Sequence, residues 1–364
     1  MNSSPYAVII GSGSYLPTRK IPNSHFLHHT FFDSGGKKLE KSNEEIIAKF
    51  KDITGIEERR YVTDDLVASD IGFYAAEQAL LSSYLDKETL DYIIVAHNFG
   101  DMREDNRRSD CLPTLASRVK QKLEIKNPKT VAYDIPFGCA GWLQGVIQAN
   151  YFIKSGEAQR ILVIGAETLS RIADPHDRDS MIYSDGAGAI ILESRISQEP
   201  VGILSHYSET FANGHTFTIS LNRSNDLQYP VDHLFLKMNG HKLYEYALKL
   251  VPQVIKVAIG KADLFLSDID KLLIHQANHK MDVAIFDRLA GLFGMDKLSQ
   301  EIMPMTISWL GNSSVATIPT LYDLIMKGQM KNQNIKKNDV LAFAAVGAGL
   351  NINSLIYRVP VESN

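Results

Sequence analysis

The segment Tyr133-Asp-Ile-Pro-Phe-Gly-Cys-Ala-Gly-Trp142 decides how this chain is interpreted, because it places a cysteine between a strand and a helix. The apolar run 130–135 predicts a buried strand, and the amphipathic stretch 142–153 predicts a helix. A cysteine at this junction lies near a helix N-terminus, where partial positive charge favours a thiolate. From this segment alone, Cys139 is interpreted equally well as a nucleophile or as a buried structural thiol.

The composition is that of an ordinary globular protein, with 45% hydrophobic and 22% charged residues among 364. A net charge of −4 argues against nucleic acid as a partner. The apolar runs are too short and too often interrupted to predict a membrane span. Two cysteines cannot form a disulfide framework and no signal peptide is evident, so we expect a cytoplasmic protein.

Strand-like and helix-like segments alternate along the chain, which favours α/β layers. Strands are predicted at 7–11, 92–96, 130–135, 160–165, 187–193, 201–206, 216–221, 271–275, 340–345 and 354–359. Helices are predicted at 69–84, 113–123, 142–155, 240–260, 280–293 and 314–327. Residues 23–45 are interpreted as an insertion and residues 98–112 as a polar loop of the kind that often contacts substrates.

The two halves of the chain resemble each other weakly. The helix after Cys139 ends in Ile153-Lys-Ser-Gly156, and a helix in the second half ends in Ile325-Met-Lys-Gly328. Repeats of this kind predict a duplicated core with a pseudo-two-fold axis, divided into residues 1–195 and 196–364. A coincidence of alternating strands and helices is the alternative.

Two further residues stand at strand-to-helix junctions. His275 closes the apolar strand in Leu272-Leu-Ile-His-Gln-Ala-Asn278, at the carboxyl end where α/β sheets bind ligands. Asn312 follows a glycine before a predicted helix, where a helix cap is the alternative interpretation. In a duplicated core the Asn312 turn would face Cys139. A Cys, a His and an Asn at such turns favour a nucleophilic site more strongly than any of the three alone.

Six segments, in this order along nearly the whole chain, resemble the type III β-ketoacyl-acyl-carrier-protein synthases of the thiolase superfamily. They are Ile10-Gly-Ser-Gly-Ser-Tyr-Leu-Pro17, Thr54-Gly-Ile-Glu-Glu-Arg-Arg60, Gly138-Cys-Ala-Gly141, Tyr183-Ser-Asp-Gly-Ala-Gly-Ala189, His275-Gln-Ala-Asn278 and Gly311-Asn-Ser-Ser314. The resemblance implies a thiolase-like five-layer αβαβα fold made of two duplicated halves. It also implies a homodimer and a triad of Cys139, His275 and Asn312.

The same resemblance implies a condensing reaction of fatty acid, related lipid or polyketide biosynthesis. An acyl group would move from its thioester to Cys139, and a malonyl-acyl-carrier-protein would then lose carbon dioxide and attack it. His275 and Asn312 would donate hydrogen bonds to the developing enolate, while backbone N–H groups of the Gly347-Ala348-Gly349 turn would help bind the oxyanion. No cofactor or metal is expected, because the substrates arrive as acyl-carrier-protein or CoA thioesters.

By resemblance, Asn278 would position the pantetheine arm and Leu112 would gate the acyl pocket across a dimer interface. Lys280 and Arg288 match positions that dock the acidic carrier protein, with solvated surface charges as the alternative. Cys111 is expected to be an unreactive thiol that lines the acyl channel.

Lys49 and Ile53 stand where family members that take acetyl-CoA often have a Trp and an Arg around the adenine. Without an aromatic platform or a guanidinium there, we hypothesise a primer that arrives on a carrier protein or is longer than acetyl. One alternative is a ketosynthase of a dialkylresorcinol or aryl-polyene pathway, which joins a β-ketoacyl thioester to a second acyl chain. A non-catalytic partner subunit of a ketosynthase heterodimer is another.

Three further motifs are interpreted structurally. Gly11-Ser-Gly13 lacks the helix and third glycine of a dinucleotide-binding turn. Asp185-Gly-Ala-Gly-Ala189 is expected to form a tight turn with close helix–sheet packing. The histidines at 25, 28 and 29 are expected on a lid surface, with metal binding as the less favoured alternative.

Overall fold

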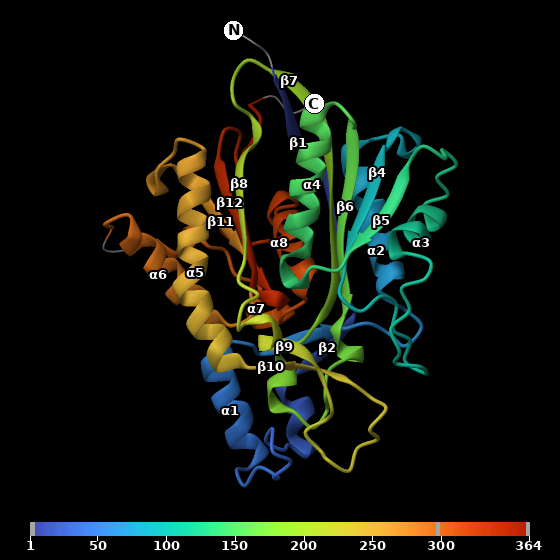
Figure 1. Ribbon diagram of the computed structural model, residues 1–364, viewed down its shortest axis with the longest axis vertical. Helices are drawn as coiled ribbons and strands as arrows, with labels where there is room; N and C mark the ends of the chain where they lie inside the picture. The colour runs from blue at the N-terminus through green and yellow to red at the C-terminus, as the bar shows by residue number, and fades with distance from the viewer. Residues whose placement is uncertain (1–3, 296–298, 362–364) are drawn as a thin grey trace.

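The computed structural model describes residues 4–295 and 299–361 and contains two central sheets with helices between them (Figure 1). The first sheet has the strand order β1-β7-β6-β4-β5, in which β4 is parallel to β5 and β6. Its strands are β1 (Ser4–Tyr15), β4 (Tyr92–Ala96), β5 (Val131–Ile135), β6 (Arg160–Thr168) and β7 (Asp185–Ser197). The strand β5, which leads to Cys139, therefore lies at the edge of this sheet.

The second sheet has the order β11-β12-β13-β8, with β11 parallel to β12 and the other pairs antiparallel. Its strands are β8 (Gly202–Thr210), β11 (Lys271–Ile274), β12 (Val340–Gly347) and β13 (Asn351–Arg358). Two small two-stranded sheets complete the structure. They are β2 (Arg19–Pro22) with β3 (Glu58–Tyr61), and β9 (Ile219–Asn222) with β10 (Phe235–Met238).

The helices form three layers around the two sheets. Figure 1 shows α4 (Gly141–Ser155) and α8 (Thr317–Met326) between the sheets. The outer layers contain α2 (Ala68–Ser83) with α3 (Leu115–Lys122) on one side, and α5 (Gly240–Lys261) with α6 (His279–Leu292) on the other. The predicted five-layer αβαβα fold is thereby confirmed. No helix within residues 4–295 and 299–361 is long and apolar enough to cross a membrane.

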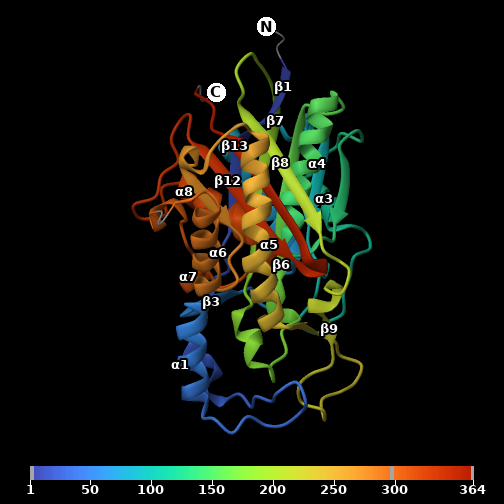
Figure 2. The same ribbon diagram turned by 60° about the vertical axis from the view of Figure 1, so that its left-hand side comes forward.

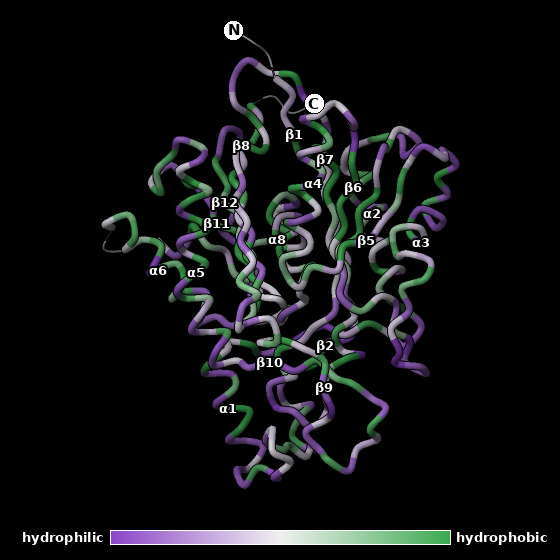
Figure 3. The backbone as a smooth tube through the Cα atoms, viewed as in Figure 1, coloured by the Kyte–Doolittle hydropathy of each residue, from purple (hydrophilic) through white to green (hydrophobic). Residues whose placement is uncertain are grey.

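The central layer is held by a hydrophobic core in which Trp142 of α4 packs close to Phe343 of β12. Figure 3 shows hydrophobic segments concentrated in the sheets and in the helices between them. Glycines let the buried helix approach the strands: a Cβ on Gly188 would lie 2.6 Å from the backbone nitrogen of Thr320. The stretch 185–189 begins strand β7, so the predicted tight turn is wrong while the predicted close helix–sheet packing is confirmed.

The remaining differences from the predicted elements lie mainly in short or polar segments. Residues 216–221 divide into a 3-10 turn (Thr216–Thr218) and the strand β9, so the single predicted strand is wrong at its start. The predicted insertion leads into α1 (Asn43–Thr54), whose capping box begins at Ser42. Figure 2 shows α1 and the loop before it at one end of the molecule, beneath α7 (Ile307–Leu310).

The close approach of α8 to β7 leads to a prediction about stability. We expect Gly188→Ala to lower the free energy of unfolding by about 1–3 kcal/mol, because its Cβ would overlap backbone atoms of α8. Gly260→Ala is the matched control: a Cβ there meets no atom within 4 Å, and alanine favours the helix by up to about 1 kcal/mol. Urea denaturation of both variants checks this, and equal stability of the two would contradict it.

Candidate active site

Cys139 lies in a short 3-10 turn, Gly138–Ala140, between β5 and α4. Gly138 has a φ of +62°, and a Cβ on it would lie 2.5 Å from the backbone nitrogen of Ala348. A Cβ on Gly347 would likewise lie 2.4 Å from the backbone nitrogen of Cys139. The Cys139 turn and the turn after β12 therefore meet backbone against backbone, and only glycine fits at both points.

His275 is the first residue after β11, and its backbone N–H donates to the Ala344 carbonyl of β12 at 2.8 Å. The next residue, Gln276, is fully buried. Its side-chain oxygen accepts hydrogen bonds from the backbone N–H groups of Thr306 at 2.8 Å and Ile307 at 3.0 Å. The glutamine of the His-Gln-Ala-Asn motif thus fixes the loop before α7, which leads to Asn312.

Asn312 is held by backbone pairing with the chain on either side of Tyr183. Its N–H donates to the Ile182 carbonyl at 2.9 Å, and its carbonyl accepts from the N–H of Ser184 at 2.8 Å. The Asn312 Oδ1 atom accepts the N–H of Ser314 at 2.8 Å, so the residue also caps the turn that follows. This bond agrees with the helix-cap interpretation of Asn312, and its role in a nucleophilic site stays a prediction.

The three residues of the predicted triad line one cavity of about 160 Å³. In the sequence, Cys139 and His275 are 136 positions apart (275 − 139), and His275 and Asn312 are 37 positions apart (312 − 275). The rest of the wall is mostly apolar and includes Phe99, Leu169, Tyr183, Ile219, Leu221, Leu236 and Val346. The cavity can therefore hold an apolar group next to the thiol.

Burial decides the charge states in this cavity. It raises the pKa of the Cys139 thiol to about 11, against a side-chain hydrogen bond from Ser314 that lowers the pKa. Desolvation therefore outweighs the groups around Cys139 that favour the thiolate. Burial also lowers the pKa of His275 to about 4, although the Ser314 backbone carbonyl opposes this shift. The imidazole is neutral at neutral pH.

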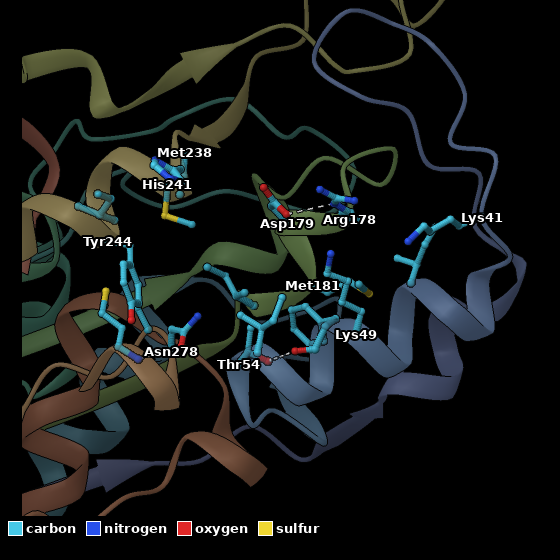
Figure 4. A pocket seen from close by; sticks show the side chains of 18 of the residues that line it. Lys41, Lys49, Thr54, Arg178, Asp179, Met181, Met238, His241, Tyr244 and Asn278 are labelled. Carbon is cyan, nitrogen blue, oxygen red and sulfur yellow. Dashed lines mark hydrogen bonds and ion pairs between the residues drawn. The ribbon is translucent and has the colours of Figure 1, made fainter. Parts of the chain in front are cut away.

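A wider cavity of about 530 Å³ lies next to the thiol cavity, and Figure 4 shows side chains that line it. The two cavities share Met238, Leu243, Ala277 and Met281 in their walls. Lys49 and Ile53 of α1 line the wider cavity. These are the two positions where family members that take acetyl-CoA often have a Trp and an Arg around the adenine. Arg178 and Lys41 also line the wider cavity, and sequence reasoning had not singled out either residue.

The other predicted site residues lie in several places. Asn278 lines the wider cavity and caps α6, where its Oδ1 accepts from the Met281 N–H at 3.1 Å. Lys280 pairs with Asp52 of α1 at 3.0 Å, and Arg288 is exposed on α6. The Ala348 carbonyl accepts from Asn351 Nδ2 at 2.7 Å, which fixes the glycine turn.

Leu112 and Cys111 lie on the polar loop, away from the thiol cavity of their own chain. Leu112 is 88% exposed, which leaves its predicted contact with a second subunit as a prediction. Cys111 is also exposed, so its expected place in the wall of the acyl channel is wrong for a single chain. Residues 103–112 are exposed, whereas Gly100, Asp101 and Met102 of the same loop are buried.

The insertion holds its histidines in aromatic contacts. The His25 and His29 rings are 5.6 Å apart, and Phe26 packs against both. Within residues 4–295 and 299–361, no group of three or more His, Cys, Asp or Glu residues is arranged to hold a metal ion.

Two polar residues beside the cysteine were missed. Asn98 follows β4 and lines the thiol cavity, and Glu167 lies near the end of β6, buried. Both stand at the carboxyl ends of parallel strands, the same position that singled out His275. That signal, applied to every strand, would have found them.

Comparison with known proteins agrees with this geometry. Residues 133–210 match the family model of 3-oxoacyl-[acyl-carrier-protein] synthase III, and residues 259–359 match the model of its C-terminal part. The chain is 31% identical over 355 residues to β-ketoacyl-[acyl-carrier-protein] synthase III 1 of Vibrio parahaemolyticus, covering 97% of this chain and 99% of that protein.

The chain belongs to the β-ketoacyl-[acyl-carrier-protein] synthase III family. Synthase III structures from Aquifex aeolicus and Thermus thermophilus superpose on it with TM-scores of 0.76 and 0.78, each at 27% identity. The alignments cover 97% and 98% of this chain, and 99% and 100% of those structures. This synthase III family member is therefore an acyl-transferring condensing enzyme with the thiolase fold.

The buried thiol of this family member leads to a prediction about pH. We expect the rate of Cys139 alkylation by iodoacetamide to rise about tenfold per pH unit from pH 8 to 10, because the thiolate fraction rises that steeply below a pKa of about 11. Mass spectrometry of the Cys139 peptide separates this reaction from that of the exposed Cys111. A rate that reaches a plateau near pH 8 would contradict the effect of burial.

Proposed function

We propose that this enzyme transfers an acyl group to Cys139 and condenses it with a malonyl group carried by acyl carrier protein. The observation that carries the proposal is the shared cavity of Cys139, His275 and Asn312, reached from the wider cavity. The two halves of the duplicated core, residues 1–195 and 196–364, supply the thiol on one side and the two hydrogen-bond donors on the other.

In the first step, the Cys139 sulfur attacks the carbonyl carbon of an acyl thioester. The bond from this carbon to the donor thiol breaks, and the departing sulfur takes up the proton that Cys139 loses. The backbone N–H of Cys139 lies against the Gly347-Ala348-Gly349 turn, which supports these groups as donors to the oxyanion.

In the second step, a malonyl thioester loses carbon dioxide next to the acyl-cysteine. Neutral His275 and the Asn312 amide donate hydrogen bonds to the thioester oxygen, where the negative charge of the enolate collects. The enolate carbon then attacks the acyl-cysteine carbonyl, and the Cys139 sulfur leaves as a thiolate that takes up a proton from solvent. A neutral imidazole suits this work, because it can donate without first being protonated.

The wider cavity fits the arm that carries both substrates. Asn278 lines it and would bind an amide of the pantetheine, while Lys280 and Arg288 on α6 would meet acidic side chains of the carrier protein. The chemistry uses no cofactor or metal. The unpaired edge of β5 favours a second copy of the chain as a partner, since edge strands pair readily.

The donor of the first acyl group is proposed to be an acyl carrier protein. Neither Lys49 nor Ile53 offers the flat aromatic or guanidinium surface that holds an adenine, so these two positions do not favour CoA as the donor. A carrier protein would gain additional contacts at α6.

A second candidate follows from the apolar wall of the wider cavity, which includes Ile46, Phe50, Ile53, Met181, Ile182 and Leu243. Such a wall favours a second substrate with an acyl chain of its own. On this reading the enzyme joins a β-ketoacyl thioester to the acyl group on Cys139, as ketosynthases of the dialkylresorcinol or aryl-polyene type do. Condensation assays with malonyl and β-ketoacyl carrier proteins distinguish the two.

The different roles proposed for Cys139, His275 and Asn312 predict that their substitution affects different steps of the reaction. We expect Cys139→Ala to abolish acylation, whereas His275→Ala and Asn312→Ala keep it and lose about 100- to 1,000-fold in decarboxylation, because each removes one donor to the enolate. Intact-protein mass spectrometry measures acylation, and carbon dioxide release measures the second step. The exposed His28→Ala is the control. Equal loss of acylation in all three site variants would oppose these roles.

The donor proposal predicts a preference in the first step. We expect Cys139 to be acylated faster from an acyl carrier protein than from the matching acyl-CoA, and Lys280→Glu to weaken only the reaction with the carrier protein. Time-resolved mass spectrometry of the Cys139 peptide measures both. Rapid acetylation from acetyl-CoA, unaffected by the substitution, would contradict a carrier donor.

A further inference from the structure

A chain of polar side chains runs from a buried carboxyl group to the Cys139 sulfur. The Asn98 side-chain amide donates to Glu167 Oε1 at 2.5 Å and to Ser314 Oγ at 3.3 Å. Ser314 lines the same cavity as Cys139, and its side chain lowers the pKa of the Cys139 thiol. Glu167 is 1% exposed, and Asn98 also lines this cavity. Glu167, Asn98 and Ser314 thus form one hydrogen-bonded network beside Cys139.

The geometry of the network shows which group donates and which accepts each hydrogen bond. Asn98 Nδ2 carries two N–H groups, and Glu167 and Ser314 each accept one of them. Because the Ser314 oxygen accepts from Asn98, its own O–H is left to donate, and Ser314 lines the same cavity as Cys139. A hydroxyl that donates to sulfur favours the thiolate over the thiol.

Ser314 also connects this network to the triad. Its backbone N–H donates to Asn312 Oδ1, and its φ of +53° lies in the left-handed region that a non-glycine residue seldom adopts. Backbone strain of this kind persists where the surroundings enforce it. Here the hydrogen bonds to Asn98 and Asn312 hold the residue from both sides.

Glu167, at the end of the network away from Cys139, can be neutral or negatively charged. Burial raises the pKa of Glu167 to about 7, while His97 and Asn98 lower the pKa. Its negative charge in turn raises the pKa of Cys139. The other ionisable groups that act on this region are His97 after β4, Asp185 of β7, Tyr183 and His275.

We propose that Ser314 is a further catalytic residue, which donates its hydroxyl to the Cys139 sulfur, and that Asn98 and Glu167 position it and tune its effect. Protonated Glu167 leaves the hydroxyl free to stabilise the thiolate, whereas ionised Glu167 opposes the thiolate through its charge. The proposal rests on the proposed role of Cys139 as the nucleophile.

Two substitutions at opposite ends of the network must act in opposite directions. Glu167→Gln keeps an oxygen that accepts from Asn98 and removes the charge, so the alkylation rate of Cys139 at pH 8 should rise about three- to tenfold. Ser314→Gly removes the hydroxyl at a backbone conformation that glycine adopts readily, so the rate should fall by a similar factor.

The experiment measures iodoacetamide alkylation of the Cys139 peptide from pH 5 to 10 in the full-length protein, with folding checked by thermal melting. Asn98→Ala should slow the reaction, and the Asn98→Ala/Ser314→Gly double variant should be no slower than Ser314→Gly, because Asn98 acts through Ser314. Ser313→Ala is the matched control: its hydroxyl contacts Thr317 at 3.4 Å and should leave the profile unchanged.

Opposite shifts of the two pH profiles support the network, because loss of structure alone would move both variants the same way. Shifts in the same direction, additive losses in the double variant or an unchanged profile would overturn it. Failure of the proposed function would look different: the profiles would shift as expected while no acyl group is condensed.

Discussion

The contact between two glycine turns is the constraint on which the active site depends. Gly138 and Gly347 bring the Cys139 turn against the end of β12 so closely that no side chain fits between them. The β11–β12 pairing then carries His275 to a fixed position relative to the sulfur, through the bond from its N–H to Ala344. Cys139 from one sheet and His275 from the other are thus placed by backbone contacts.

Burial sets the charge states of the two residues brought together in this way. A thiol with a pKa of about 11 and an imidazole with a pKa of about 4 are both neutral before the reaction. Neutral groups cost less to bury than ions, and inside a protein their hydrogen bonds to a developing oxyanion are stronger than in water. On the proposed mechanism, neutral His275 therefore stabilises charge that arises only during the reaction.

The sequence allowed the layers to be predicted, because long apolar periods mark β4, β6, α4 and α5. Glycine turns at the junctions singled out Cys139, His275 and Asn312, which the structure brings to one cavity. Asn98 and Glu167 were not singled out, because the strand-end signal that marked His275 was not applied to β4 and β6. The stretch 185–189 was misjudged as a turn because its glycines serve the approach of α8, not a change of chain direction. The exposure of Leu112 and Cys111 depends on how the loop folds and on what covers it, which local patterns do not encode.

The joined cavities have a kinetic consequence. Because the inner cavity opens into the wider one through walls that share Met238, Leu243, Ala277 and Met281, an arm lying in this passage blocks it for another. On the proposed reaction, the first donor must leave before the second thioester reaches Cys139. Turnover then follows ping-pong kinetics. An excess of either thioester inhibits the reaction of the other, because both occupy the same passage.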